Sequence, residues 1–165
     1  MPNKTIISAE PNKQELFIIR EFDAPRELLY KAFTERELLT QWLGPCTLKM
    51  SIDTYENKSH GAWRFIHADE EGNEYAFNGT IHEVCPPERI IRTFEFEGLP
   101  MKGEVSLEFA TFEALPNNRS KLTIQAIYKS VASRDGHVNS GMEHGVVDSH
   151  NALDELLMNL KNNHD

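Results

Sequence analysis

The sequence predicts an α+β protein in which a curved antiparallel sheet packs around one long helix near the C-terminus. From residue 47 to residue 128, apolar side chains recur at every second position, as they do in strands. From residue 140 to residue 160 they recur at intervals of three, four and seven, as on one face of a helix. A run of strands followed by a separate helix is typical of α+β proteins rather than of alternating α/β proteins.

The long helix is predicted at Ser140–Leu160. Ser140 followed by Glu143 fits a capping box, which marks a helix start. No second helix pattern follows that could cover the apolar stripe, so a strongly twisted sheet must bury it. A sheet curled around one helix often leaves a hollow between them, and we expect function there. The stripe consists of Met142, Val146, Leu153, Leu156, Leu157 and Leu160.

Residues 1–15 are expected to form a loose polar lead-in with a possible short strand at Thr5–Ser8, and residues 16–162 a single domain. A length of 165 residues fits one domain. The domain opens with a strand at Leu16–Phe22. Two short helices follow, the first containing Leu28–Phe33 and the second at Glu35–Trp42.

About six antiparallel strands then lead to the long helix. Their connections are short enough for hairpins, which favours a meander. Alternation predicts that one residue in two faces inward. The expected inward sets include Trp63, Phe65 and His67; Tyr75, Phe77, Gly79 and Ile81; Val105, Leu107 and Phe109; and Leu122, Ile124, Ala126 and Tyr128.

Composition narrows the class of protein. The chain is 39% hydrophobic and 26% charged, as in an ordinary globular protein, and its formal net charge of −9 disfavours nucleic acid and anionic lipid as partners. No apolar run is long enough to span a membrane, and Met1–Glu10 lacks the apolar core of a signal peptide. Two cysteines, Cys46 and Cys85, do not make a disulfide framework. We therefore expect a cytoplasmic protein.

Several short motifs occur in a fixed order along the chain. They are Arg20–Pro25, Trp42–Pro45, Gly61–Phe65, Gly79–Val84 with Pro86–Ile90, and Gly141–Gly145. In this order and spacing the chain resembles bacterial relatives of the C-terminal domain of the activator of the heat-shock chaperone ATPase. That family belongs to the START-like (SRPBCC) superfamily, and the resemblance covers Leu16 to Leu160.

The resemblance implies a helix-grip fold with a cavity between the sheet and the long helix, and it does not imply one activity. Superfamily members bind lipids or hormones, sequester reactive compounds, or act as cyclases. Two positions depart from many relatives: Leu43 stands where they have a second tryptophan, and Val146 stands where they have tryptophan. Both departures replace an aromatic ring by a smaller side chain, so the size of the pocket is expected to differ.

The sequence offers no catalytic motif and no cofactor signature. It contains neither a Gly-x-Ser-x-Gly elbow, nor a phosphate-binding glycine loop, nor a His-Glu-x-x-His zinc pattern. His82 and Cys85 are three residues apart in a strand, so their side chains point to opposite faces. We expect no catalytic residue, no metal and no organic cofactor.

Two charged residues are candidate polar anchors for a ligand. Glu83 shares its parity with inward Ile81, and a carboxylate in an apolar cavity would have a raised pKa and could act as an acid or base. A bulge near Pro86 could instead turn Glu83 outward, or Glu83 could pair with Arg89 or Arg92. Arg20 could hold a ligand carboxylate, or it could equally pair with a neighbouring glutamate.

The candidate lining of the cavity is mainly aromatic. Core packing is the simpler explanation for each residue alone, but in a helix-grip fold some of them should face the cavity. Ser149 interrupts the helical stripe and could bond a ligand or merely a helix carbonyl. The set is Trp42, Trp63, Phe65, Phe77, Phe94, Phe109, Met142, Val146 and Ser149.

These observations predict a non-enzymatic protein that binds a small apolar or amphipathic molecule between the sheet and the C-terminal helix. A co-chaperone that acts through an external surface is the first alternative, and a cyclase or hydrolase is the second. A roomy cavity with a buried polar residue would favour an enzyme. A filled core with an exposed apolar or acidic patch would favour a co-chaperone. The oligomeric state is left open.

Overall fold

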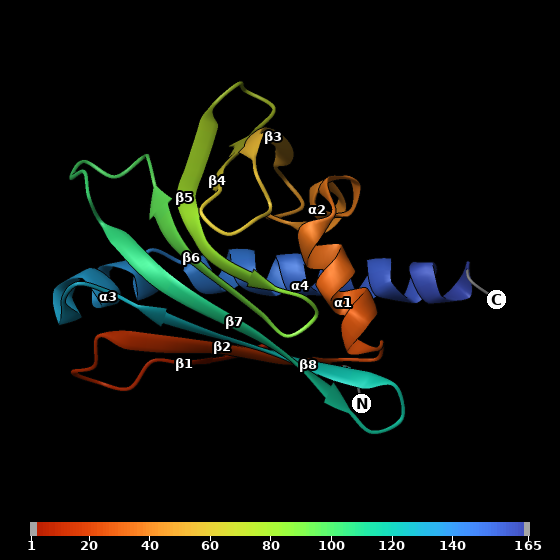
Figure 1. The fold of residues 1–165 in the computed structure, drawn as a ribbon. Coiled ribbons are helices and arrows are strands. Elements are labelled where there is room, and N and C mark those ends of the chain that lie inside the picture. The colour runs from red at the N-terminus through yellow and green to blue at the C-terminus, as the bar shows by residue number, and fades with distance from the viewer. Residues whose placement is uncertain (1–2, 164–165) are drawn as a thin grey trace.

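The computed structural model describes residues 3–163, which form one eight-stranded antiparallel sheet with helices on one side. The sheet order is β1-β2-β8-β7-β6-β5-β4-β3, so the six strands after the first two helices form a meander. Figure 1 shows the sheet bent around the long helix α4, which lies behind the strands in that view. The expected α+β helix-grip architecture is therefore confirmed.

The eight strands are short to medium in length. The first, β1, confirms the short strand expected at Thr5–Ser8, so part of the lead-in is integrated in the sheet; Met1 and Pro2 lie outside the described residues. The bounds are β1 Ile6–Ser8, β2 Glu15–Phe22, β3 Lys49–Tyr55, β4 Ala62–Ala68, β5 Glu74–Cys85, β6 Arg89–Phe96, β7 Val105–Leu115 and β8 Arg119–Ile127.

Four helices complete the described part of the chain. They are α1 Arg26–Thr34, α2 Arg36–Trp42, α3 Val131–Val138 and α4 Met142–Asn162. The two short helices after β2 and the long C-terminal helix were expected, whereas α3 was not. Gly136, a poor helix former, lies inside α3 and weakens its sequence pattern. The N-cap of α3 is Ser130, whose side chain accepts a hydrogen bond from the Ser133 amide.

The predicted capping box at the start of α4 is wrong. Ser140 lies before the helix, and its hydroxyl donates to the carbonyl of His137 at the end of α3. Gly141 takes the N-cap position with φ 86°, a left-handed conformation that glycine adopts without strain. The chain therefore turns directly from one helix into the next, and Ser140 stabilises the end of α3 instead.

The inner face of the sheet forms the core with α4. Leu153, Leu156 and Leu157 of α4 are buried in a cluster that also contains Trp63 and Phe65 of β4. A second, smaller cluster joins Met142 and Val146 to the residues Leu16, Ile18, Ala126 and Tyr128. The apolar stripe of α4 is thus covered along its length by the sheet, as its spacing predicted.

The predicted inward set of β7 is wrong by one residue. Ser106 and Phe112 are buried, and Ala110 packs against the core, so the even-numbered residues face inward. Phe109 pairs with Ile91 and Gln125 on the outer face. Both faces of this strand carry apolar residues, so alternation along the sequence does not show which face is buried. The pairing of Phe112 with Leu122 places the even-numbered residues inward.

A buried polar network fixes α4 against the N-terminal strands. The Arg20 guanidinium pairs with Asp154 and donates to Thr5 and Asn151 at 3.0 Å each. His150 shares a 2.9 Å hydrogen bond with the Thr5 hydroxyl. Burial, together with the nearby positive charge of Arg20, lowers the pKa of His150 to about 4.

Replacing Leu153 by Ala should lower the free energy of unfolding by about 2–5 kcal/mol, because this fully buried side chain would leave a cavity. Denaturant unfolding measures this change. Met158→Ala in the same helix is the control, since Met158 is 45% exposed and should change stability by no more than about 0.5 kcal/mol. Equal small effects of both substitutions would mean that the stripe is not buried.

The low pKa of His150 should make stability fall in acid. The unfolded chain takes up a proton near pH 6.5, while the folded protein resists until about pH 4, so stability present above pH 6.5 is lost as the pH falls between these values. The expected loss is about 3 kcal/mol. Denaturant unfolding at a series of pH values should show a flatter profile for His150→Gln. The exposed-site variant His82→Gln should keep the wild-type slope, and a wild-type slope in His150→Gln would contradict the assignment.

Candidate functional site

A small internal cavity lies between the sheet and the first helix. Its volume is about 30 Å³, enough for one or two water molecules. The walls are mostly apolar, with Phe33 of α1 facing strand residues of the inner face. Among the lining residues Asn57 is exposed, which places the mouth of the cavity beside it and Tyr55. The lining residues are Phe33, Tyr55, Asn57, Ile81, Ile90, Arg92, Glu108, Ala110 and Ile124.

Two opposite charges face this cavity. Arg92 of β6 and Glu108 of β7 are paired residues in adjacent strands, which places their side chains side by side on the inner face. Arg92 Nε lies 3.6 Å from Glu108 Oε1, longer than a direct hydrogen bond, and the two side chains are only 27% and 16% exposed. Burial raises the pKa of Glu108, and the adjacent guanidinium opposes this shift.

The guanidinium of Arg92 is held by an aromatic ring. It lies over Trp63 at 4.4 Å from the ring centroid, a cation–π contact. The Trp63 side chain reaches across β5, and its indole N–H donates a hydrogen bond to the carbonyl of Thr93 at 3.2 Å. Gly79 makes this possible, because a Cβ there would lie 1.9 Å from the Thr93 oxygen and 2.4 Å from the indole nitrogen. Gly79 of the sequence motif therefore leaves room for the Trp63 ring to take this position, and the ring in turn positions Arg92.

Further polar groups lie on the same inner face. Burial raises the pKa of Tyr55 at the cavity mouth to about 12, despite the nearby positive charge of Arg92. The Tyr128 hydroxyl is hydrogen-bonded to His137 of α3, whose ring stacks on Phe94 at 6.0 Å. Burial lowers the pKa of His137 and raises that of Tyr128, so both groups favour their neutral forms.

Four of the predicted aromatic residues lie on the inner face. Trp63 and Phe65 are buried, while Phe77 and Phe94 are half-buried and pack with each other at 5.4 Å between ring centroids. Trp63 touches the site through Arg92, but none of the four lines the internal cavity. Trp42 is buried between the short helices and donates its indole N–H to the carbonyl of Ala32 at 2.9 Å, a contact that belongs to core packing.

The helical candidates have structural partners. Met142 and Val146 pack on the second apolar cluster, away from the cavity lining. Ser149 is 5% exposed; its hydroxyl donates to the carbonyl of Gly145 and accepts from the amide of Gly44 at 2.8 Å. Ser149 therefore bonds a helix carbonyl, one of its two expected roles, and also attaches the loop after α2 to α4.

The structure does not place the two proposed polar anchors in the cavity. A bulge between Ile81 and Glu83 turns Glu83 outward, where it pairs with Arg89 at 2.6 Å. Arg20 faces inward but already contacts Asp154, Asn151 and Thr5, which leaves it no role as a free ligand anchor. Phe109, predicted to line the cavity, lies on the outer face because of the register of β7.

Arg92 and Glu108 are the charged residues that line the cavity instead, and sequence reasoning missed both. Arg92 shares parity with the buried Ile90 and with Phe94, which was the available signal. A charged residue in such a strand is usually taken as outward-facing, and Glu108 was assigned outward by the register error in β7. Their pairing across two strands shows only in the fold.

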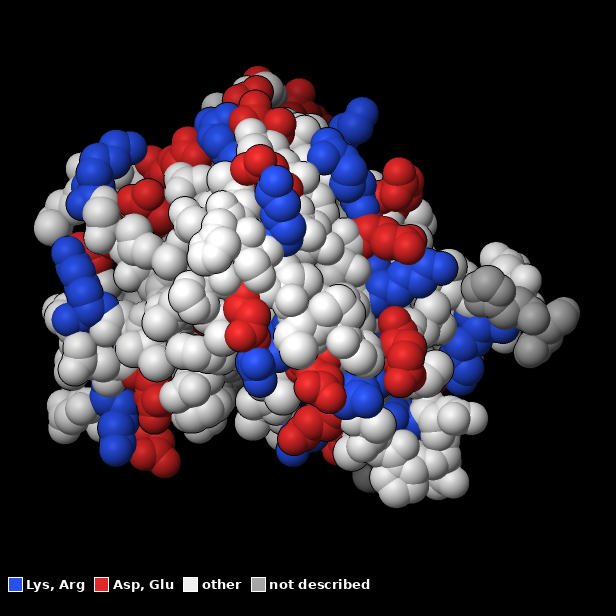
Figure 2. All heavy atoms as spheres, viewed as in Figure 1, with Lys and Arg blue, Asp and Glu red and all other residues white. Residues whose placement is uncertain are grey.

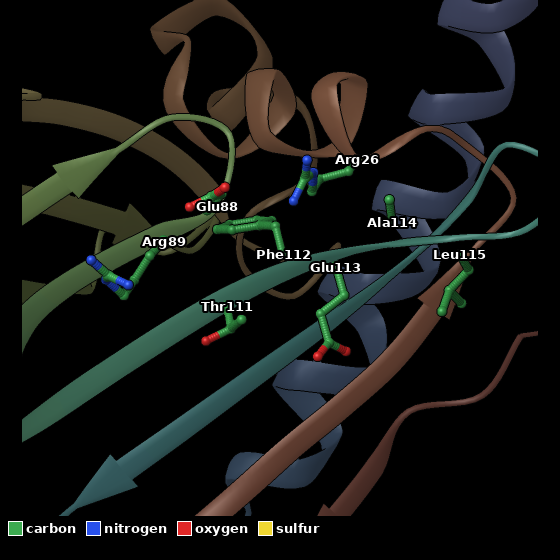
Figure 3. A pocket seen from close by; sticks show the side chains of 8 residues that line it. All are labelled: Arg26, Glu88, Arg89, Thr111, Phe112, Glu113, Ala114 and Leu115. Atoms are coloured by element: carbon green, nitrogen blue, oxygen red, sulfur yellow. The ribbon is translucent and has the colours of Figure 1, made fainter.

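A second, open groove of about 640 Å³ lies where the β5–β6 turn meets α1 and the end of β7. Figure 3 shows Arg26 and Glu88 extending toward each other from opposite walls above Phe112. Phe112 is 1% exposed, so it offers the groove almost no apolar surface. Ligand sites are usually enclosed and apolar with a few convergent polar groups, a description that fits the internal cavity better than this groove.

Within residues 3–163, no group of three or more His, Cys, Asp or Glu residues is arranged to hold a metal ion. None of the helices in this part of the chain is long and apolar enough to cross a membrane.

Comparison with known proteins identifies relatives of the whole domain. A family model described as Activator of Hsp90 ATPase homolog 1-like protein matches residues 23–158. No curated protein matches the chain significantly. Among solved structures, a Rhodobacter sphaeroides protein is 22% identical with a TM-score of 0.83, covering 95% of this chain and 99% of its own.

Two further solved structures show the same fold. A protein from Arthrobacter aurescens is 20% identical with a TM-score of 0.83, covering 93% of this chain and 91% of its own. The AHSA1 protein from Silicibacter pomeroyi is 22% identical with a TM-score of 0.70, covering 87% of this chain and 97% of its own. These likenesses establish the fold and leave the site to be judged from its own residues.

The inner ion pair should weaken the protein rather than stabilise it. Glu108→Leu alone should lower the free energy of unfolding by about 3 kcal/mol, because it leaves Arg92 unpaired. The double variant Arg92→Met, Glu108→Leu should recover that loss or exceed wild-type stability by about 1 kcal/mol or more. Glu83→Ala, which breaks an outer pair exposed by 35% and 43%, is the control and should cost no more than about 1 kcal/mol. A double variant less stable than Glu108→Leu would show that the pair is kept for stability.

Proposed function

The chain belongs to the family of Activator of Hsp90 ATPase homolog 1-like proteins, and from that premise we propose that it binds a small amphipathic molecule in the internal cavity between the sheet and α1, rather than beside the long helix as the sequence predicted. The polar end of the molecule is held at Arg92 and Glu108. Its apolar part lies along Phe33, Ile90 and Ile124, which line the same cavity. The proposal is of a binding protein, with no reaction assigned to the site.

The observation that carries this proposal is the pair of opposite charges on the inner face, whose side chains are only 27% and 16% exposed. Taking a guanidinium and a carboxylate even partly out of water is costly, and an imperfect contact at 3.6 Å repays that cost poorly. Apolar side chains in both positions would fill the space at lower cost. Perturbed ionisable groups in a cavity are concentrated at functional sites, so recognition of a ligand supplies the missing reason for this pair.

The ligand has to enlarge the cavity in order to enter. The present volume of about 30 Å³ is far below the roughly 300 Å³ or more typical of ligand pockets. Phe33, Tyr55 and Arg92 are each only half-buried at the edge of the cavity. Rotation of Phe33 and Tyr55 would open the space while Arg92 stays over the Trp63 ring and the buried leucines of α4 stay in place.

Binding should be visible through Trp63, whose ring contacts Arg92. A library of small amphipathic molecules, screened by tryptophan fluorescence, should yield binders with dissociation constants on the order of 1 mM or tighter. Amide chemical-shift changes should be concentrated at β6, β7 and the mouth near Tyr55. Binders that shift only the outer face of the sheet, or no binders at millimolar concentration, would contradict the proposal.

A co-chaperone role is the second candidate, and the outer face of the sheet favours it. Solvent-facing sides of antiparallel sheets are usually polar, but here Ile91 pairs with Phe109, and Leu107 pairs with Ile127. Phe17 lies beside them, opposite Gln125. Figure 2 shows uncharged atoms over a large part of the face that Figure 1 presents, interrupted by a few charged groups. Apolar patches of this kind often bind other proteins.

An ATPase assay with the heat-shock chaperone distinguishes the binding role from the co-chaperone role. We expect this protein alone to stimulate the ATPase of a heat-shock chaperone from the same organism weakly or not at all. The formal net charge is −9, and the sequence contains no basic cluster that could steer the protein to a partner by long-range attraction. Titration in an ATPase assay, with a specific chaperone inhibitor to remove background, measures the effect. Saturable several-fold stimulation that is lost in Phe109→Ser would make the co-chaperone role the better assignment.

A further inference from the structure

The pair in the internal cavity also indicates which polar group it would hold. We infer that Arg92 and Glu108 together receive a neutral group with a hydrogen-bond acceptor and a donor on one edge, as in a primary carboxamide or a lactam. This inference rests on the proposed ligand-binding function and adds the chemical class of the polar group to it.

Charge selects a neutral group. Arg92 and Glu108 face each other at 3.6 Å, so each lies within reach of anything that contacts the other. A ligand carboxylate that approached Arg92 would meet the Glu108 carboxylate, and a ligand ammonium that approached Glu108 would meet the guanidinium. Repulsion between like charges is strong where water is excluded. A neutral group avoids both conflicts.

The separation of the pair selects two atoms rather than one. Hydrogen bonds of this kind are about 2.9 Å long. A single hydroxyl oxygen bonded to both Arg92 Nε and Glu108 Oε1, which are 3.6 Å apart, would hold its two bonds at an acute angle of about 75°. The oxygen and nitrogen of an amide are about 2.2 Å apart, so two nearly parallel bonds can span the same gap.

The donor side of the pair is positioned before any ligand arrives. Trp63 lies under the guanidinium at 4.4 Å and is itself held by its hydrogen bond to the Thr93 carbonyl. A fixed donor favours a planar group with defined geometry and lowers the entropic cost of binding. Ile90, Ala110 and Ile124 provide the apolar wall beside this edge, which suits a compact hydrocarbon body.

Four probes with similar apolar bodies test the inference at pH 7: benzamide, benzyl alcohol, benzoate and benzylammonium. Affinities for the whole protein are measured by tryptophan fluorescence and by chemical shifts. Benzamide should bind on the order of tenfold more tightly than benzoate or benzylammonium, and several-fold more tightly than benzyl alcohol.

The variant Glu108→Gln should change this ranking. It removes the negative charge and leaves Arg92 free to hold an anion, so the affinity for benzoate should rise on the order of tenfold relative to that for benzamide. Glu113→Gln is the matched control, because Glu113 lies on the same strand but is exposed on the outer side. It should keep the wild-type ranking. If Glu108→Gln does not fold, the ranking of the four probes by the wild-type protein decides the question alone.

The possible results of these measurements distinguish a failure of the carboxamide inference from a failure of the proposed ligand-binding function. Probes that bind at the cavity with equal affinity, or an unchanged ranking in folded Glu108→Gln, would overturn the inference and leave ligand binding in place. If none of the four probes binds at millimolar concentration, while other amphipathic molecules shift the cavity residues, the inference again fails alone. If nothing shifts the cavity residues, the proposed function fails and the inference with it.

Discussion

The position of α4 against the sheet is the constraint on which the rest of the structure depends. Apolar burial of Leu153, Leu156 and Leu157 brings the helix and sheet together, but such contacts are not directional. Direction comes from polar contacts at two places along the helix. Arg20 reaches Asp154 from the sheet, and Ser149 bonds the Gly44 amide of the loop after α2. These contacts hold α4 in place on the sheet, whereas the internal cavity is lined by Asn57 and by residues of α1, β3 and β5 to β8.

The inner face of β6 and β7 carries an unusual mixture of residues. Ile90 and Phe112 are ordinary core residues, yet Arg92 and Glu108 occupy neighbouring positions on the same strands. The charged groups are tolerated because Trp63 covers one of them and each partly neutralises the other. By contrast, the buried Arg20 has a full structural explanation, since it pins the helix. Arg92 and Glu108 instead meet at 3.6 Å beside a cavity and attach no other element of the fold, which is why the proposed function rests on them and not on Arg20.

Much of the fold can be predicted from periodicity, because burial of one face leaves a clear pattern in β4, β8 and α4. The errors have local causes. α3 contains Gly136, and Ser140 resembles a helix cap although it bonds the preceding helix. The bulge before Glu83 and the two apolar faces of β7 hide the register. The site was harder to predict, since Arg92 and Glu108 meet only after β6 and β7 pair and both strands curl over the core.

The small size of the cavity is consistent with a binding site that closes when empty. Water in an apolar space is unfavourable unless polar groups hold it, so half-buried side chains are expected to collapse onto an unoccupied hollow. Separation of α4 from the sheet would break the Arg20 network and the bond of Ser149 to the loop after α2. Phe33 and Tyr55 line the cavity together with Arg92 and Glu108, and rotation of the two rings would disturb aromatic contacts rather than the polar contacts that hold α4. Under the proposed function, a ligand would therefore enter on the side of α1 and the end of β3, away from the long helix.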